Sequence, residues 1–164
     1  MKSIITADSR LHGGTINGTR FGSLTYETED IIFMASGLIG FTYLQNFVVL
    51  SKDVSSPFRW LQSLEEPAFA LLVAFPERYC KSYQPRVKAE DQAEIGLGDA
   101  QACMIFVTAS IPPGRPQDLT LNLRAPILIN PESRQAIQCV LDDETYTTKY
   151  RVFDLENREG MTAA

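Results

Sequence analysis

The chain has 164 residues and a formal net charge of −5, with 45% hydrophobic and 21% charged residues. This length and composition suit one soluble globular domain, and the acidity argues against direct nucleic acid binding, whose affinity comes largely from neutralised phosphates. No apolar run approaches the roughly 20 residues of a membrane-spanning helix, and the start lacks the hydrophobic segment of a secretory signal. We therefore expect a cytoplasmic protein without membrane contact.

Three segments are expected along the chain. Residues 1–18 contain three glycines among polar residues and show no periodicity, which predicts a flexible N-terminal leader. Residues 19–153 hold every strand pattern and form one β domain without an interdomain linker. Residues 154–164 are a polar C-terminal tail.

The domain begins with two short strand patterns, at residues 21–26 and 31–34, and the second could pair back on the first. The next segment, SGLIGF at 36–41, has two glycines three residues apart. It predicts a tight bend with positive φ or close backbone approach at the glycines. A phosphate-binding loop is the alternative, but the lysine and hydroxyl residue of such a loop are missing. Another strand follows at residues 47–50.

Residues 57–63 alternate in polarity, with Phe58, Trp60 and Gln62 on one face. Trp60, the only tryptophan, is expected in the core because large aromatic side chains are usually buried; a partner-binding anchor is the alternative. The run AFALLVAF at 68–75 lies between two prolines. It predicts a strand covered on both faces, in the middle of a sandwich or barrel.

Residues 88–95 are the best helical candidate, and Gly96 is suited to end that helix. The acidic residues of this helix predict a solvated face. A further apolar strand is expected at residues 103–107, followed by a proline-rich loop.

Residues 118–141 carry the strongest strand pattern in the chain. Every second residue from 119 to 123 is leucine, which is typical of a strand with one buried face. Pro126 interrupts this strand because proline has no N–H to donate. An apolar run resumes at 127–129, and residues 135–141 return antiparallel after a turn.

An acidic turn at residues 142–144 and a final extended segment at 146–153 complete about nine or ten short strands, spaced by about ten residues. This rhythm predicts an all-β, single-domain antiparallel barrel or sandwich with one or two short helices.

Catalytic motifs are missing from the sequence. His12 is the only histidine and lies in the predicted leader, which makes a Ser-His-Asp or Cys-His arrangement improbable. The three cysteines lack the spacing of a zinc site or a disulfide framework. We therefore predict no catalytic residue, no cofactor and no metal ligand, and a binding or regulatory protein rather than an enzyme.

Several stretches match a known family in order and spacing. They are SGLIGF at 36–41, PF at 57–58 with LQS at 61–63, PAF at 67–69 with a proline at 76, and NLRAPILIN at 122–130 followed by residues 135–141 and Tyr146. Together they resemble the flagellar assembly factor FliW over about residues 19–150. Ile39 stands where the family usually has proline, which changes the rigidity of the bend and should leave the fold unchanged.

The resemblance implies a small, cytoplasmic, β-rich and non-catalytic protein with two partners. FliW-like proteins bind flagellin before export, and they bind the carbon storage regulator CsrA, an RNA-binding repressor of flagellin translation. The partners compete, so that accumulated flagellin releases CsrA to silence flagellin messenger RNA. The free protein is expected to be monomeric.

Candidate contact residues follow from the chemistry of these partners. CsrA must be basic where it meets RNA, so the acidic clusters are its candidate contacts: Glu90, Asp91, Glu94, Asp142, Asp143 and Glu144. Flagellin is expected to offer a helical, apolar segment that needs an exposed apolar groove or sheet face. The candidates for that face are Phe41, Tyr43, Phe58 and Trp60. The alternatives are a small β-barrel module with an unknown ligand and an enzyme with an unfamiliar site.

Overall fold

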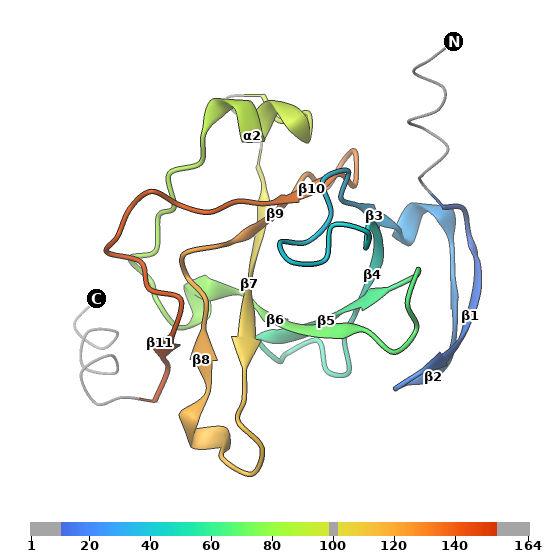
Figure 1. Cartoon of the computed structure of the whole chain (residues 1–164), viewed down its shortest axis with the longest axis horizontal. Helices are drawn as coiled ribbons and strands as arrows, with labels where there is room; N and C mark the ends of the chain where they lie inside the picture. The colour runs from blue at the N-terminus through green and yellow to red at the C-terminus, as the bar shows by residue number, and fades with distance from the viewer. Residues whose placement is uncertain (1–10, 99–101, 154–164) are drawn as a thin grey trace.

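The computed structural model describes residues 11–98 and 102–153, which form mostly short antiparallel strands. Figure 1 shows the strands curling around a common interior, with the short helix at Ala89–Glu94 above them. The prediction of an all-β chain with few, short helices is confirmed. Residues 1–10 of the predicted leader and the predicted tail at 154–164 lie outside the described residues.

The strands, in chain order, are β1 (Gly14–Thr19), β2 (Gly22–Tyr26), β3 (Ile32–Phe33), β4 (Asn46–Leu50), β5 (Phe58–Ser63), β6 (Ala70–Ala74), β7 (Met104–Ser110), β8 (Thr120–Leu121), β9 (Ile127–Ile129), β10 (Ala136–Gln138) and β11 (Tyr150–Arg151). The helical segments are α2 (Ala89–Glu94) and the 3₁₀ turns η1 (Thr28–Asp30), η2 (Pro76–Arg78) and η3 (Pro116–Asp118). The predicted helix is confirmed as α2, and Gly96 ends it with a positive φ of 73°. Within the described part of the chain, no helix has the length and apolar character needed to cross a membrane.

The main sheet runs in the order β10-β9-β7-β6-β5-β4-β3, with every neighbouring pair antiparallel. The backbone N–H of Phe33 donates to the carbonyl oxygen of Arg134 at 2.9 Å, and Phe33 forms a parallel bridge with Gln135. The sheet therefore curves until its two ends meet. β1 and β2 form a separate two-stranded ribbon at its side (Figure 1).

β7 organises the second half of the sheet. Its first residues pair with β9 and its last residues pair with β8, so β8 and β9 are two parts of one interrupted strand. The interruption covers residues 122–126, which form a turn that ends at Pro126. The strand predicted from the alternating leucines at 119–123 is therefore too long, because only Thr120 and Leu121 pair as β8. Asn130 closes the following turn, because its Oδ1 accepts from the N–H groups of Glu132 and Ser133. β10 then returns antiparallel on β9, as predicted.

β6 lies at the centre of the sheet between β5 and β7, and hydrophobic clusters cover both of its faces. Leu71 and Val73 face the first cluster, which includes Phe47 and Phe106. Leu72 and Ala74 face the second cluster. The prediction that this apolar run is covered on both faces is confirmed in part: Val73 and Ala74 are fully buried, whereas residues 70–72 are partly exposed.

Replacing Leu72 with aspartate is expected to lower the free energy of unfolding by about 3 kcal/mol or more. Leu72 packs on the second cluster and pairs with Trp60 in the middle of the sheet, so the carboxylate would lose water without gaining a partner. Urea denaturation measures the change. An unfolding midpoint equal to that of the wild-type protein would contradict the placement of this strand.

Two predictions about the N-terminal half are wrong. The predicted leader extends too far, because Gly14–Thr19 form β1 and Ile16 packs with Ile31 and Val48. The sequence hides this strand because Ile16 is its only apolar residue. The predicted strand at 31–34 does not pair back on the first strand: β3 pairs with β4 instead.

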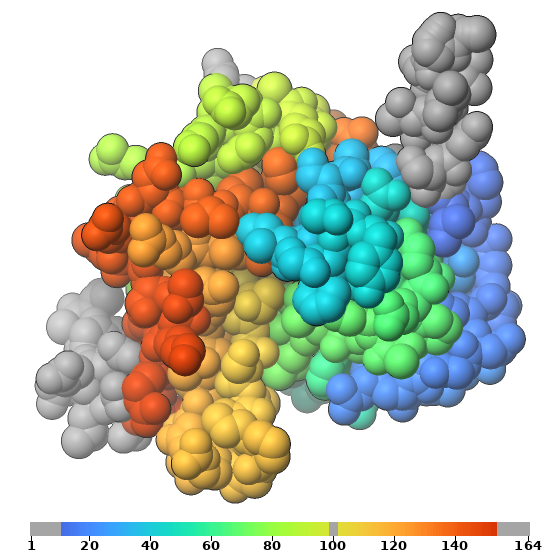
Figure 2. Space-filling model, in the orientation of Figure 1, coloured from blue at the N-terminus to red at the C-terminus, as the bar shows by residue number. Residues whose placement is uncertain are grey.

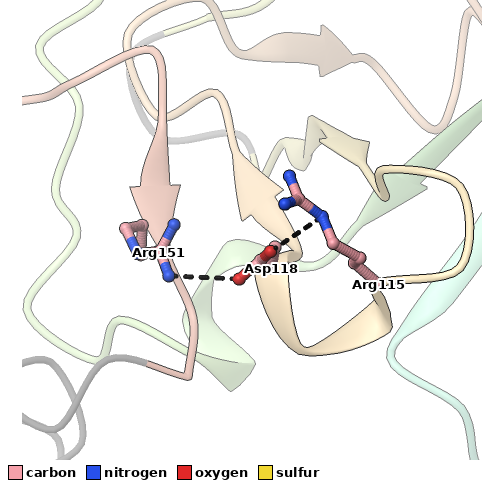
Figure 3. Close-up of polar contacts among 3 residues, drawn as sticks. All are labelled: Arg115, Asp118 and Arg151. Atoms are coloured by element: carbon pink, nitrogen blue, oxygen red, sulfur yellow. Dashed lines mark hydrogen bonds and ion pairs between the residues drawn. The ribbon is translucent and has the colours of Figure 1, made fainter.

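Predictions for Trp60 and the last segment also need correction. Trp60 is half-buried rather than a core residue, and its ring packs against Phe21 and Arg20 at the tip of the β1–β2 ribbon. Of the extended segment predicted at 146–153, only Tyr150 and Arg151 form a strand, because their partner β8 has just two residues. The Asp118 carboxylate in η3 forms ion pairs with Arg115, in the loop after β7, at 3.1 Å and with Arg151 of β11 at 3.3 Å (Figure 3).

Candidate protein-binding groove and acidic surface

A groove of about 340 Å³ lies beside the loop between β3 and β4. Figure 2 shows this loop in cyan, standing out between the orange and green parts of the surface. Three regions of the chain line the groove: the loop itself, the neighbouring strands β6 and β7 with Phe69, and the segments around β9 and β10. The lining residues are Leu38, Ile39, Phe41, Phe69, Leu71, Thr108, Ala109, Ser110, Asn122, Arg124, Ala125, Gln138, Val140 and Thr148.

Large apolar side chains stand exposed at this groove. Ile39 is 51% exposed, Phe41 is 42% exposed and Val140 is 57% exposed. Val140 is about 100 residues from Ile39 and Phe41 in the sequence, so only the fold brings the three residues to one groove. Contiguous exposed apolar surface of this kind is typical of an interaction site.

The loop at the groove owes its shape to two glycines. Gly37 has a φ of 69°, and a Cβ added there would overlap the backbone carbonyl of Thr42. Gly40 has a φ of 89°, with open space where a Cβ would lie. Both the positive φ and the close backbone approach predicted for this bend are therefore confirmed.

Side chains from other elements hold the loop in place. The N–H of Ile39 donates to Oε1 of Gln138 at 3.0 Å, and Nε2 of Gln138 donates to the carbonyl oxygen of Ala125 at 3.2 Å. Ser36 Oγ donates to Oε2 of Glu94 on α2 at 2.7 Å. A proline in place of Ile39 would have no N–H for Gln138, so this chain has a loop contact that proline excludes.

Of the four aromatic residues proposed from the sequence, the groove contains Phe41. Its ring packs against Phe69 with the centroids 5.0 Å apart. Tyr43 is 60% exposed, and its hydroxyl donates to Glu66 at 3.0 Å, which raises the pKa of Tyr43. Tyr43 is not among the residues that line the groove.

The other two aromatic residues lie elsewhere. Phe58 packs on the second hydrophobic cluster, with its ring 6.0 Å from that of Tyr79. Trp60 packs against Phe21 of the β1–β2 ribbon. The structure therefore brings Phe41 to the groove and separates it from Phe58 and Trp60.

Sequence reasoning missed Ile39 and Val140 as groove residues. Ile39 carries no usable signal, because Leu38 in the same glycine bend is buried in the core whereas Ile39 is exposed. Val140 carries a signal in the alternation of its segment: Cys139 and Leu141 share the buried face, which places Val140 on the opposite one.

The two acidic clusters predicted from the sequence lie next to each other. Lys88, at the start of α2, approaches Asp142 with 3.7 Å between Nζ and Oδ2. This ion pair connects the helix to the loop that follows Leu141. Glu90 and Glu94 on the helix, like all three acidic residues of the loop, are exposed.

Some of these acidic residues also contact their own fold. Glu94 accepts the hydrogen bond from Ser36. Asp91 lies beside Cys139, whose pKa is raised to about 12, first by burial and then by that carboxylate. The side chain and backbone of Thr145 donate to Asp143 and lower its pKa, and two nearby arginines add to this effect. Asp143 therefore keeps its negative charge at neutral pH.

Basic residues are interspersed in this acidic surface. Arg86 and Arg124 lie close enough to favour the charged form of Asp143. Arg124 also lines the groove and donates from Nε to the carbonyl oxygen of Leu141 at 3.3 Å. The groove and the acidic surface therefore share a border along the segment that follows β10.

Across 11–98 and 102–153, no group of three or more His, Cys, Asp or Glu side chains is placed to hold a metal ion. The three cysteines in these ranges are free thiols.

Comparison with known proteins assigns this architecture to a family. The family model for the FliW protein matches residues 15–152. The chain belongs to the FliW family. The match begins inside β1, four residues before the domain start expected from the sequence, at Thr19.

Relatives in this family resemble the chain over most of its length, and each is named flagellar assembly factor FliW. The FliW of Syntrophotalea carbinolica is 35% identical over 132 residues, covering 80% of this chain and 93% of that protein. The FliW of Syntrophus aciditrophicus is 36% identical, covering 89% and 90% of the two chains. The FliW of Leptospira biflexa is 30% identical, covering 91% and 96%.

A solved FliW structure has the same fold. The crystal structure of a flagellar assembly factor FliW superposes with a TM-score of 0.79 at 28% sequence identity. The superposition covers 86% of this chain and 98% of the other. The resemblance to FliW found in the sequence is therefore confirmed at the level of the fold.

Proposed function

We propose that this protein is a non-catalytic flagellar assembly factor that binds flagellin in the cytoplasm and antagonises the translational regulator CsrA. Its relatives carry the name flagellar assembly factor. The observation that carries the proposal for this chain is the exposed apolar groove of a FliW-family fold, bordered by acidic residues. The groove is the flagellin site, and the acidic surface is the CsrA site.

The shape and chemistry of the groove support a helical partner segment. Ile39, Phe41 and Val140 expose apolar surface that a helix can cover with side chains spaced three, four and seven residues apart. Arg124 and Gln138 add polar groups at the border, which can fix the orientation of the bound segment.

The acidic surface supports a basic partner. Residues on α2 and in the loop after Leu141 place carboxylates within one region, and Asp143 stays ionised. A basic protein surface would be attracted to this region, and its bound RNA would be repelled. Because Arg124 and Val140 lie between the two surfaces, a flagellin segment in the groove reaches the edge of the CsrA site. Competition between the partners follows from this shared border.

The proposal is tested by co-purification at low salt with flagellin and CsrA from the same cell. We expect each partner to be recovered with this protein, and excess flagellin to displace CsrA. Recovery of neither partner would overturn the proposal in favour of a module that binds another ligand in the groove.

Charge reversal on α2 is expected to weaken CsrA binding. Replacing Glu90, Asp91 and Glu94 with lysine should lower the affinity by about tenfold and reduce its dependence on salt, since several exposed charge pairs are lost together. Isothermal titration calorimetry at two salt concentrations measures both effects. Unchanged affinity at low salt would exclude this cluster from the CsrA site.

Glu94 requires controls of its own because it also holds the loop through Ser36. Ser36→Ala removes that hydrogen bond and keeps the charge, whereas Glu94→Gln removes the charge and keeps an acceptor oxygen. If the charge matters, Ser36→Ala binds CsrA like the wild-type protein, and Glu94→Gln shows part of the loss. If instead Ser36→Ala weakens CsrA binding and Glu94→Gln does not, the effect of the triple variant comes from the displaced loop and not from the lost charge.

A further inference from the structure

The tip of the β1–β2 ribbon carries basic and aromatic residues that neither the groove nor the acidic surface uses. The guanidinium carbon of Arg20 lies 4.3 Å from the ring centroid of Trp60, and the Phe21 and Trp60 rings pack edge to face at 5.6 Å. Lys52, from the loop between β4 and β5, places its ammonium group 5.7 Å from the Phe21 ring. Two cations therefore flank one aromatic pair.

Beside these residues lies an open pocket of about 480 Å³. Its apolar surface comes from Phe21, Leu24 and Leu50, and its charged groups come from Arg20 and Lys52. No acidic residue is among the described residues that line it. In a protein with a net charge of −5, this pocket is a local positive site with an apolar base.

The backbone holds this tip in place before any partner arrives. Thr19 Oγ1 donates to the carbonyl oxygen of Gly22 at 2.5 Å and accepts from the N–H of Phe21 at 3.0 Å. Gly22 has a φ of 87°, which favours glycine at this position of the turn. Arg20 and Phe21 are thus presented by a preorganised turn, which lowers the entropy lost on binding.

The charges of Arg20 and Lys52 are not neutralised within the described part of the fold. Neither side chain forms an ion pair with a carboxylate in residues 11–98 or 102–153. The neighbouring Asp53 is engaged elsewhere, because its Oδ1 accepts from both the backbone N–H and the hydroxyl of Ser55. Two exposed cations beside apolar surface match a segment that carries carboxylates next to an apolar side chain.

We propose that this ribbon tip is a second docking surface, which binds an acidic segment of a partner protein that carries one large apolar side chain. The apolar side chain enters the pocket between Leu24 and Leu50, and carboxylates pair with Arg20 and Lys52. A single-stranded nucleic acid fits less well, because Arg20 already covers the Trp60 ring and two cations neutralise few phosphates.

This surface is independent of the proposed function. None of the residues that line the ribbon pocket also lines the groove, and the ribbon lies at the edge of the molecule opposite β11 (Figure 1). If flagellin or CsrA failed to bind, the proposal for the ribbon tip would be unaffected. If the acidic peptide failed to bind the ribbon tip, the proposals for flagellin and CsrA would be unaffected.

The test uses the only tryptophan of the chain, Trp60, as the reporter. The full chain is titrated with the capped peptide Glu-Glu-Leu-Phe-Glu-Glu, which contains no tryptophan, while the tryptophan emission is recorded. A peptide with glutamine in place of each glutamate is the matched control, and an oligothymidylate of equal charge tests nucleic acid. The variant Arg20→Gln/Lys52→Gln is compared with Arg78→Gln/Lys81→Gln, which removes two exposed cations elsewhere.

We expect the acidic peptide to change the Trp60 emission saturably, and the Arg20→Gln/Lys52→Gln variant to weaken this binding at least about fivefold. The variant with changes at 78 and 81 should bind like the wild-type protein, and all variants should keep its thermal unfolding midpoint. Equal binding of the glutamine peptide, an unchanged Kd in the ribbon variant, or no response to the acidic peptide would each overturn the proposal. Tighter binding of the oligothymidylate would overturn it in favour of nucleic acid.

Discussion

Replacing Gly37 with alanine will lower the free energy of unfolding by about 3 kcal/mol and abolish flagellin binding at the groove. Gly37 has a φ of 69°, and the added Cβ would overlap the backbone carbonyl of Thr42. A flexible side chain could move away from a new methyl group, but this carbonyl belongs to the other limb of the same tight loop. The loop must therefore open, and it carries Ile39 and Phe41 into the groove.

Gly40→Ala is the matched control for this loop. Gly40 also has a positive φ, 89°, but no atom lies within 4 Å of the added Cβ. Only the conformational strain remains, so the loss should be about 1 kcal/mol. Urea denaturation measures both variants, and calorimetry with flagellin measures binding. Equal losses for the two variants would contradict the close approach at Gly37.

Replacing Val140 with aspartate will weaken flagellin binding roughly 100-fold and leave the fold intact. Val140 is 57% exposed in the absence of a partner, so the carboxylate stays hydrated in the isolated protein. When an apolar helix covers the groove, the same carboxylate must lose most of its water, and pairing with Arg124 at the border of the groove would offset only part of that cost. The cost therefore falls on the complex and not on the folded chain.

Val54→Asp is the control for this effect. Val54 is 83% exposed, lies in the loop between β4 and β5, and does not line the groove. It introduces the same chemical change at a position outside the groove, and this variant should bind flagellin like the wild-type protein. If Val140→Asp also binds flagellin with the wild-type Kd, the groove is not the flagellin site.

Pattern-based prediction succeeded for the candidate site where local chemistry was sufficient. The glycine bend was predicted because positive φ and close approach are properties of a few neighbouring residues, and Gly37 has both. The exposed aromatic residues were harder to predict, because the exposure of a side chain depends on what the rest of the fold covers. Trp60 and Phe41 have similar apolar character, yet only Phe41 lies in the groove.

For the acidic clusters, too, the sequence predicted the local property and not the contacts between distant residues. Charge is read directly from the sequence, and both clusters are indeed largely exposed. Their adjacency, through Lys88 and Asp142, depends on where α2 packs against the sheet. The anchoring of the loop by Glu94 likewise depends on a contact across 58 positions of sequence.

Short antiparallel strands could be predicted from the sequence alone, because the alternation of apolar and polar residues and the positions of proline and glycine act over a few residues. Which strands pair and which apolar side chains remain exposed depended on the folded arrangement of the whole chain. Those outcomes depend on residues far apart in the chain: β7 divides its pairing between β8 and β9, and Ile39 meets Val140 at one groove. No local pattern encodes such contacts, because their energy arises only when the distant surfaces are brought together and water is excluded.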